Sequence, residues 1–219
     1  MNYFAHAIRF LDDPYFVAGT ALPDWLAVVD RRARVPSRAA QQHLQAADET
    51  VSAVARGVVQ HHRDDDWFHR SPAFTALSLE TTNRVRQVLS DDDGFRPSLL
   101  GHILIEILLD AELIQDDPPR LVQYYELLDG LDALRVAHAA SHLTTRPVPQ
   151  LAVFVPLFSA ERFLYDYADD AKLLGRLNRV LGRVGLPALE ESFQDLLPEI
   201  RGRVRAERRG LFDDWVSDH

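Results

Sequence analysis

The chain has no cysteine, and this absence removes several kinds of chemistry at once. Disulfide bonds, thiolate zinc sites, iron–sulfur clusters and a cysteine nucleophile are all excluded. A metal ion in this protein must therefore be held by histidine, aspartate and glutamate side chains, which suit Mn, Fe, Zn, Ni or Mg. The sequence also lacks a glycine-rich phosphate loop, a Gly-x-Ser-x-Gly element and a His-Glu-x-x-His motif. P-loop, serine-hydrolase and zincin chemistries have no support.

Long hydrophobic runs are missing as well. The longest one, Ile103–Leu109, is interrupted by Glu106 and is too short to cross a membrane. The first residues, from Met1 to His6, contain no basic segment followed by an apolar core, so they do not resemble a signal peptide. We therefore expect a cytoplasmic protein that does not associate with membranes.

The chain has no excess of positive charge. It has 24 lysines and arginines and 33 acidic residues, which gives a formal net charge of −9. Because phosphate contacts need a basic surface, nucleic acid is not an expected partner. The basic residues that gather near the end of the chain are expected to lie on a solvated helix face, balanced by nearby acids. They are Arg201, Arg203, Arg205, Arg208 and Arg209.

Length and composition fit one globular domain with a full core, since 47% of the 219 residues are hydrophobic and 26% are charged. Apolar residues recur at helical spacing through most of the chain. The best strand candidate, Leu151–Val155, is short. We predict an all-α, single-domain bundle of about seven to ten helices over residues 1–219, with long helices over 154–181 and 189–209. Residues 1–113 are expected to carry the site, and helices within 120–209 to complete the core.

A first polar stripe crowds three of the nine histidines and three consecutive aspartates into residues 59–70. In a helix, His61, Asp65 and His69 fall four residues apart and share one face. Imidazole and carboxylate groups at this interval are what a divalent-metal site on a helix requires. The alternative is an exposed, charged helix end. The neighbouring residues are typical of a solvated surface: His62, Arg63, Asp64 and Asp66.

A second stripe has the same spacing at His102, Glu106 and Asp110, where the residues between are all Ile or Leu. Acidic groups are almost never fully buried without a partner, so this stripe must be satisfied by other polar groups. It could form a structural network with arginines such as Arg84 or Arg135, or it could hold a metal. Counted together, the two stripes favour a metal or catalytic site over a structural network.

Three motifs resemble one known family. They are Met-Asn-Tyr-Phe-Ala-His at residues 1–6, Ala-Gly-Thr-Ala-Leu-Pro-Asp-Trp at residues 18–25 and Gly-Val-Val-Gln-His-His-Arg-Asp-Asp at residues 57–65. Bacterial acyl carrier protein phosphodiesterases begin in a similar way with Met-Asn-x-x-Ala-His. They continue with a Gly-Asn-Leu-x-x-Asp element and a Gly-(Ile/Val)-x-x-His-x-Arg-x-(Ile)-Asp segment. The resemblance covers residues 1–110.

This resemblance implies an HD-like, all-α metal-dependent phosphohydrolase. His6, Asp24, His61 and Asp65 match the polar motif positions of the family, and Arg63 matches a possible phosphate contact. Asp24 also suits the start of a helix, where it would act as a cap. The implied reaction is hydrolysis of the phosphodiester that links 4′-phosphopantetheine to a serine of acyl carrier protein, with manganese favoured.

The chain departs from the family in two places. Near His69 members usually have an acidic residue, and around His102 and Glu106 they have an Asp-His-Phe element, so the ligand set could be rearranged. Acyl carrier protein is strongly acidic and would be repelled by a chain of net charge −9 unless a local basic patch overrides this repulsion. The segments 31–38 and 201–209 are the two candidates for such a patch.

The combined prediction is a metal-dependent phosphoester or phosphodiester hydrolase acting on a phosphorylated small molecule or a phosphopantetheinyl protein. Its expected metal ligands, in one or two adjacent sites, are His6, Asp24, His61, Asp65, His69 and His102. Glu106 or Asp110 is expected to accept the proton of the attacking water, and Arg63 to neutralise phosphate charge. The alternative is a non-catalytic helical protein whose His, Asp and Glu residues form a structural network, for example at a homodimer interface, or a metal-binding protein with another role.

Overall fold

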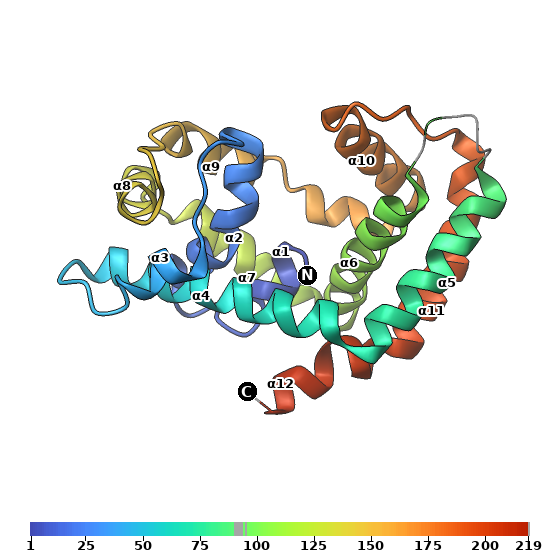
Figure 1. Ribbon diagram of the computed structural model, residues 1–219, viewed down its shortest axis with the longest axis horizontal. Helices are drawn as coiled ribbons and strands as arrows, with labels where there is room; N and C mark the ends of the chain where they lie inside the picture. The colour runs from blue at the N-terminus through green and yellow to red at the C-terminus, as the bar shows by residue number, and fades with distance from the viewer. Residues whose placement is uncertain (90–93, 95, 219) are drawn as a thin grey trace. The chain divides into compact units, whose positions relative to one another are not determined.

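A computed structural model describes residues 1–89, 94 and 96–218, and the regular elements of this part of the chain are all helical (Figure 1). The prediction of an all-α fold is confirmed. The α-helices are α1 (Tyr3–Ala7), α2 (Pro14–Val29), α3 (Ser37–Gln41), α4 (Glu49–Arg70), α5 (Pro72–Val88), α6 (Pro97–Asp116), α7 (Pro118–Asp129), α8 (Ala133–Leu143), α9 (Leu151–Ala160), α10 (Asp170–Arg183), α11 (Leu197–Arg208) and α12 (Asp214–Asp218). Three further elements are the 3₁₀ helices η2 (Phe163–Ala168) and η3 (Glu191–Leu196) and the π-helix η4 (Arg209–Asp213).

The described chain has more and shorter helices than expected. The segment 154–181 is not one helix, because α9 ends at Ala160 and Arg162 adopts a positive φ of 47°. Helix α10 then begins at Asp170, and it is capped by Asp169, whose side chain accepts a hydrogen bond from the backbone N–H of Lys172. The segment 189–209 is likewise divided between η3 and α11. The short strand candidate at 151–155 is the first half of α9.

The chain gathers into two compact units. Unit 1 comprises Met1–Asn2, Trp67–Asp116 and Phe163–His219, and unit 2 comprises Tyr3–Asp66 and Asp117–Arg162. Helix α4 contributes residues to both. None of the described helices is long and apolar enough to span a membrane.

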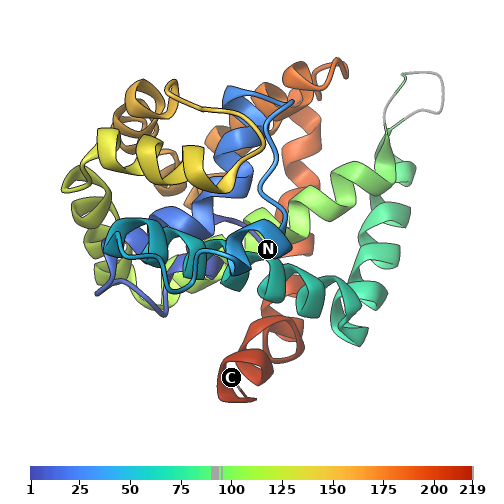
Figure 2. The same ribbon diagram turned by 60° about the vertical axis from the view of Figure 1, so that its left-hand side comes forward.

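Unit 2 has an aromatic core, in which the ring of Phe158 contacts Tyr3 and Trp25 at centroid distances of 4.9 and 5.4 Å. Helices α8 and α9 pack against each other on this unit (Figure 2). Helices α2 and α4 cross at two glycines, since a Cβ on Gly57 would lie 2.1 Å from the carbonyl oxygen of Phe16. A Cβ on Gly19 would lie 2.2 Å from the carbonyl oxygen of Val54. The two backbones are therefore in direct contact.

Unit 1 is built on the apolar helix α6, which packs against α5 and α11 (Figure 1). The expected balance of the late arginines is confirmed, because each pairs with a carboxylate of the same unit. The pairs are Arg201–Asp170, Arg203–Glu80, Arg205–Glu112, Arg208–Asp213 and Arg209–Asp214. This segment is therefore not an unbalanced basic patch.

Candidate metal centre

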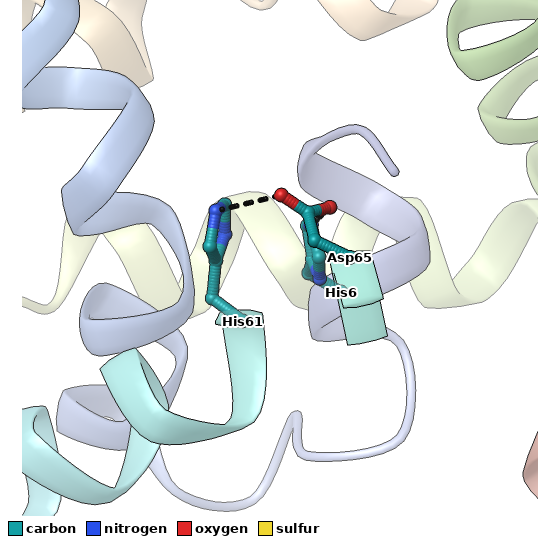
Figure 3. A group of neighbouring side chains, drawn as sticks. All are labelled: His6, His61 and Asp65. Atoms are coloured by element: carbon teal, nitrogen blue, oxygen red, sulfur yellow. Dashed lines mark ion pairs between the residues drawn. The ribbon is translucent and has the colours of Figure 1, made fainter. Parts of the chain in front are cut away.

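Three side chains from α1 and α4 converge in unit 2: His6, His61 and Asp65, which we call the His6 cluster. One potential ligand atom from each lies within 4.8 Å of the others. Figure 3 shows His61 and Asp65 pointing toward each other from successive turns of α4. His61 Nε2 lies 3.3 Å from Asp65 Oδ2, and His6 Nε2 lies 3.4 Å from Asp65 Oδ1. Each oxygen of Asp65 thus faces one imidazole.

The close crossing of α2 and α4 fixes the ring of His61. It brings the carbonyl oxygen of Thr20 to 2.8 Å from His61 Nδ1. Because a carbonyl can only accept, Nδ1 must carry the hydrogen and donate it. In the neutral ring Nε2 then keeps its lone pair on the side of Asp65. This is how metal-binding histidines are usually oriented.

The ring of His6 is fixed by Asp64, whose Oδ2 lies 3.0 Å from His6 Nδ1. Asp64 is itself held by Gln60, which donates a 2.8 Å hydrogen bond to Oδ1. His6 is only 1% exposed, and its Nε2 makes no hydrogen bond. A buried polar atom without a hydrogen bond is costly unless something else compensates it. A cation between the two Nε2 atoms and Asp65 would provide that compensation, so these residues fit a metal ion.

The electrostatics of the His6 cluster favour a cation. Burial alone would raise the pKa of Asp65, but the contacts with His6 and His61 outweigh burial and hold this pKa far below its usual range. Burial would lower the pKa of His6, but Asp64 and Asp65 raise it to about 9. The two carboxylates thus favour a positive charge at this position, and a metal ion that binds there would displace a proton from His6.

Asp24 lies one helical turn after Thr20 in α2 and is half-buried. Burial raises its pKa, while the charges of His61 and His6 act in the opposite direction. Asp24 is therefore within electrostatic reach of the His6 cluster, although it is not one of the three converging residues. The interpretation of Asp24 as a helix cap is wrong, because it lies well inside a helix that begins at Pro14 and is capped by Asp13.

A second group of three, His69, His102 and Glu106, converges in unit 1, and we call it the His69 cluster. Glu106 Oε1 lies 3.2 Å from His69 Nε2 and 3.1 Å from His102 Nε2. The terminal ammonium of Met1 is 3.2 Å from the same oxygen. Burial would raise the pKa of Glu106, but the ammonium and the two histidines hold it well below the usual range. All three residues are partly exposed.

The first stripe does not form one site. His61 and Asp65 join His6, whereas His69 joins His102 and Glu106. Asp110 is fully buried in α6 and belongs to neither cluster of the described chain. Arg63 is exposed on α4. The expected arginine partners lie elsewhere, since Arg84 pairs with Glu199 and Arg135 donates to Thr50.

The expectation that Asp64 is solvated is wrong, because it is 2% exposed and bonded to His6. Asp64 is buried because His6 of α1 lies against it. The spacing of Gln60 and Asp64, four residues apart, is the one local signal that could have revealed this. The contact between the Thr20 carbonyl and His61 could not be predicted from residue types. It is made by the backbone, where α2 and α4 cross at Gly19 and Gly57.

Comparison with models of protein families, with curated proteins and with solved structures gave no match for this chain. The likeness to the phosphodiesterase family therefore consists of the three motifs alone. Their matched residues His6, His61 and Asp65 are the three that converge in unit 2, with Asp24 in electrostatic reach.

Proposed function

We propose that the protein is an HD-like, metal-dependent phosphoester hydrolase whose metal ion is held by His6, His61 and Asp65. The observation that carries this proposal is the buried Nε2 of His6, which faces Asp65 without a hydrogen bond. The opposite nitrogen of each imidazole is occupied by a carboxylate or a carbonyl. Two imidazoles that turn Nε2 toward one carboxylate have the arrangement that a shared metal ion requires.

The division of roles follows from the contacts. A divalent ion bound there would polarise a phosphoryl oxygen and lower the pKa of a neighbouring water molecule. Asp64 and the Thr20 carbonyl orient the two imidazoles. Asp65 is 31% exposed in its side chain and marks the side from which substrate enters. Asp24 is the nearby carboxylate that burial makes more basic, so we assign it the acceptance of a proton from water.

The resemblance suggests a phosphopantetheinyl protein as substrate, and one surface feature supports an acidic partner. Four arginines between residues 31 and 38 are exposed. They belong to a segment that is fastened to α4, because the carbonyl oxygen of Val35 lies 2.8 Å from His62 Nε2. The ring of His62 lies 5.4 Å from that of His61 between centroids, so the segment is attached next to the His6 cluster. The arginines are Arg31, Arg32, Arg34 and Arg38.

Metal removal is the first test. With the ion at about 100 times its dissociation constant, binding adds about 2.7 kcal/mol to stability. For a chain of this size that corresponds to a melting temperature higher by about 5–11 °C. We expect protein purified without a histidine tag to contain metal by elemental analysis, and to melt lower after chelation. Recovery of the original melt on adding Mn, Zn, Fe or Ni identifies the ions that fit. No metal and no stabilisation by any ion would leave the structural network as the better interpretation.

Reversing the charge of the basic segment 31–38 is the second test. The Arg34→Glu/Arg38→Glu variant is expected to lower kcat/KM for holo acyl carrier protein by about 10-fold, since charge complementarity accelerates encounter. Its activity on bis(p-nitrophenyl) phosphate should stay unchanged. The Arg203→Glu/Arg209→Glu variant has the same net charge but alters another surface, and it should not discriminate between the two substrates. Equal effects of both variants on the carrier protein would remove the basic segment from the proposal.

A further inference from the structure

The potential ligand atoms of the His69 cluster form a nearly equilateral triangle. His69 Nε2 and His102 Nε2 lie 3.2 Å apart, and their distances to Glu106 Oε1 are 3.2 and 3.1 Å. An ion that binds nitrogen or oxygen at about 2.0–2.2 Å holds neighbouring ligands about 2.8–3.6 Å apart in octahedral or tetrahedral geometry. The three atoms are therefore already as far apart as the ligands of one ion.

The two imidazoles of this cluster are held by packing. Their rings stack at a centroid distance of 4.8 Å and an interplanar angle of 26°. The ring of Phe74 contacts each of them edge to face, with both centroid distances at 5.1 Å. Phe74 is buried, and it packs in turn on Phe68. Ligands fixed in this way lose little freedom on binding an ion, which is the condition for a preorganised site.

The carboxylate oxygen of the cluster already attracts positive charge. Glu106 Oε1 is approached by the ammonium of Met1 and by both imidazoles. Two imidazole nitrogens at 3.2 Å attract each other only when one carries a hydrogen and the other does not. A single divalent ion would satisfy both lone pairs and the carboxylate together, whereas two Nε2 hydrogens that both point to Glu106 would face each other across 3.2 Å.

The cluster is open rather than closed. The side chains of His69, His102 and Glu106 are 34%, 37% and 19% exposed. No fourth His, Asp or Glu of the described residues completes the group. Structural zinc sites use four protein ligands, whereas sites that exchange ligands use three and leave positions for water or substrate. Two histidines and one carboxylate are a set that also suits Fe(II).

We propose that His69, His102 and Glu106 form a second metal site, which binds a divalent first-row transition-metal ion and leaves positions open to a small anionic ligand. This site shares no residue with the His6 cluster. It does not depend on the proposed phosphoesterase activity, because its contacts lie entirely within unit 1.

The test uses Co(II) as the probe, added to the full chain after chelation and followed by calorimetry and visible absorption. Wild-type protein is expected to bind two ions per chain. The His102→Ala variant should retain one of them, with the affinity of the lost site reduced more than about 100-fold. Glu106→Gln keeps the shape of the side chain and should show the same loss. Asp65→Asn removes the other site, and adding azide or inorganic phosphate to this variant should shift the remaining Co(II) spectrum.

Two outcomes would overturn the proposal. One is His102→Ala and Glu106→Gln proteins that bind as many ions as the wild type with the same affinities. The other is an Asp65→Asn protein that shows the wild-type circular dichroism but binds no Co(II). Failure of the proposed function has a different signature, in which Asp65→Asn retains every ion and all phosphoesterase activity while His102→Ala loses one ion.

Discussion

If the proposed function holds, replacing Asp65 with asparagine removes metal binding by the His6 cluster and abolishes phosphoester hydrolysis. The substitution keeps the size of the side chain and removes the charge that faces both His6 Nε2 and His61 Nε2. A metal ion that activates water and polarises phosphate contributes several kcal/mol to catalysis, so kcat/KM is expected to fall by roughly 10³-fold or more. Hydrolysis of bis(p-nitrophenyl) phosphate, measured together with metal content, checks this result.

Two comparisons make the Asp65 result specific. His43→Ala removes a histidine that lies outside both clusters, and it should change neither metal content nor rate. Asp64→Asn should have a weaker effect than Asp65→Asn, because Asp64 orients His6 rather than binding the ion. We expect it to lower metal affinity by about 10- to 100-fold. An Asp65→Asn protein that keeps wild-type activity would refute the assignment of this cluster as the reactive centre.

The contents of the two clusters were largely predictable from the sequence, but their grouping was not. Spacing of four residues correctly paired His61 with Asp65 and His102 with Glu106, since both pairs are contacts within one helix. The third member of each cluster comes from another element: His6 from α1 and His69 from α4. Such long-range contacts depend on how helices pack, and helical periodicity contains no information about that.

The resemblance to a family supplied what periodicity could not. It selected His6 and Asp24, which lie far from α4 in sequence, as partners of His61. It did not indicate a role for Asp64, and the charged neighbours of Asp64 in the helix favoured a solvated position. The breaks at Arg162 and Asp169 also escaped prediction, since a positive φ at an arginine is dictated by packing rather than by local preference. The all-α class was the most secure inference, because it rests on apolar spacing repeated along the whole chain.

Replacing Gly57 with alanine is expected to destabilise the protein and damage the metal centre at a distance from its ligands. A Cβ at this position would lie 2.1 Å from the carbonyl oxygen of Phe16 and 2.8 Å from the Cα of Gly19. Both obstacles are backbone atoms, so no side chain can turn away and α2 must separate from α4. Overpacking of this kind costs about 1–3 kcal/mol or more, which lowers the melting temperature by about 2–12 °C.

The same displacement reaches the site through one hydrogen bond. The carbonyl oxygen of Thr20 follows Gly19 directly and holds His61 Nδ1 at 2.8 Å. When α2 moves away, this bond lengthens and His61 loses the contact that fixes its ring and its tautomer. Metal affinity of the His6 cluster should therefore fall by about 10- to 100-fold, as it does when an outer partner of a ligand is lost. Calorimetric titration of the chelated protein measures this change.

Gly175→Ala is the matched control for the Gly57 substitution. Gly175 lies inside α10, is exposed and has no atom within 4 Å of an added Cβ. Alanine there should be neutral or should stabilise the helix by about 0.5–1 kcal/mol, because glycine loses more conformational freedom on folding. If Gly57→Ala melted like Gly175→Ala and bound metal normally, the close crossing of α2 and α4 would not be what positions His61. The opposite responses of two glycine-to-alanine changes would instead show that the centre depends on the absence of a single methyl group between two helices.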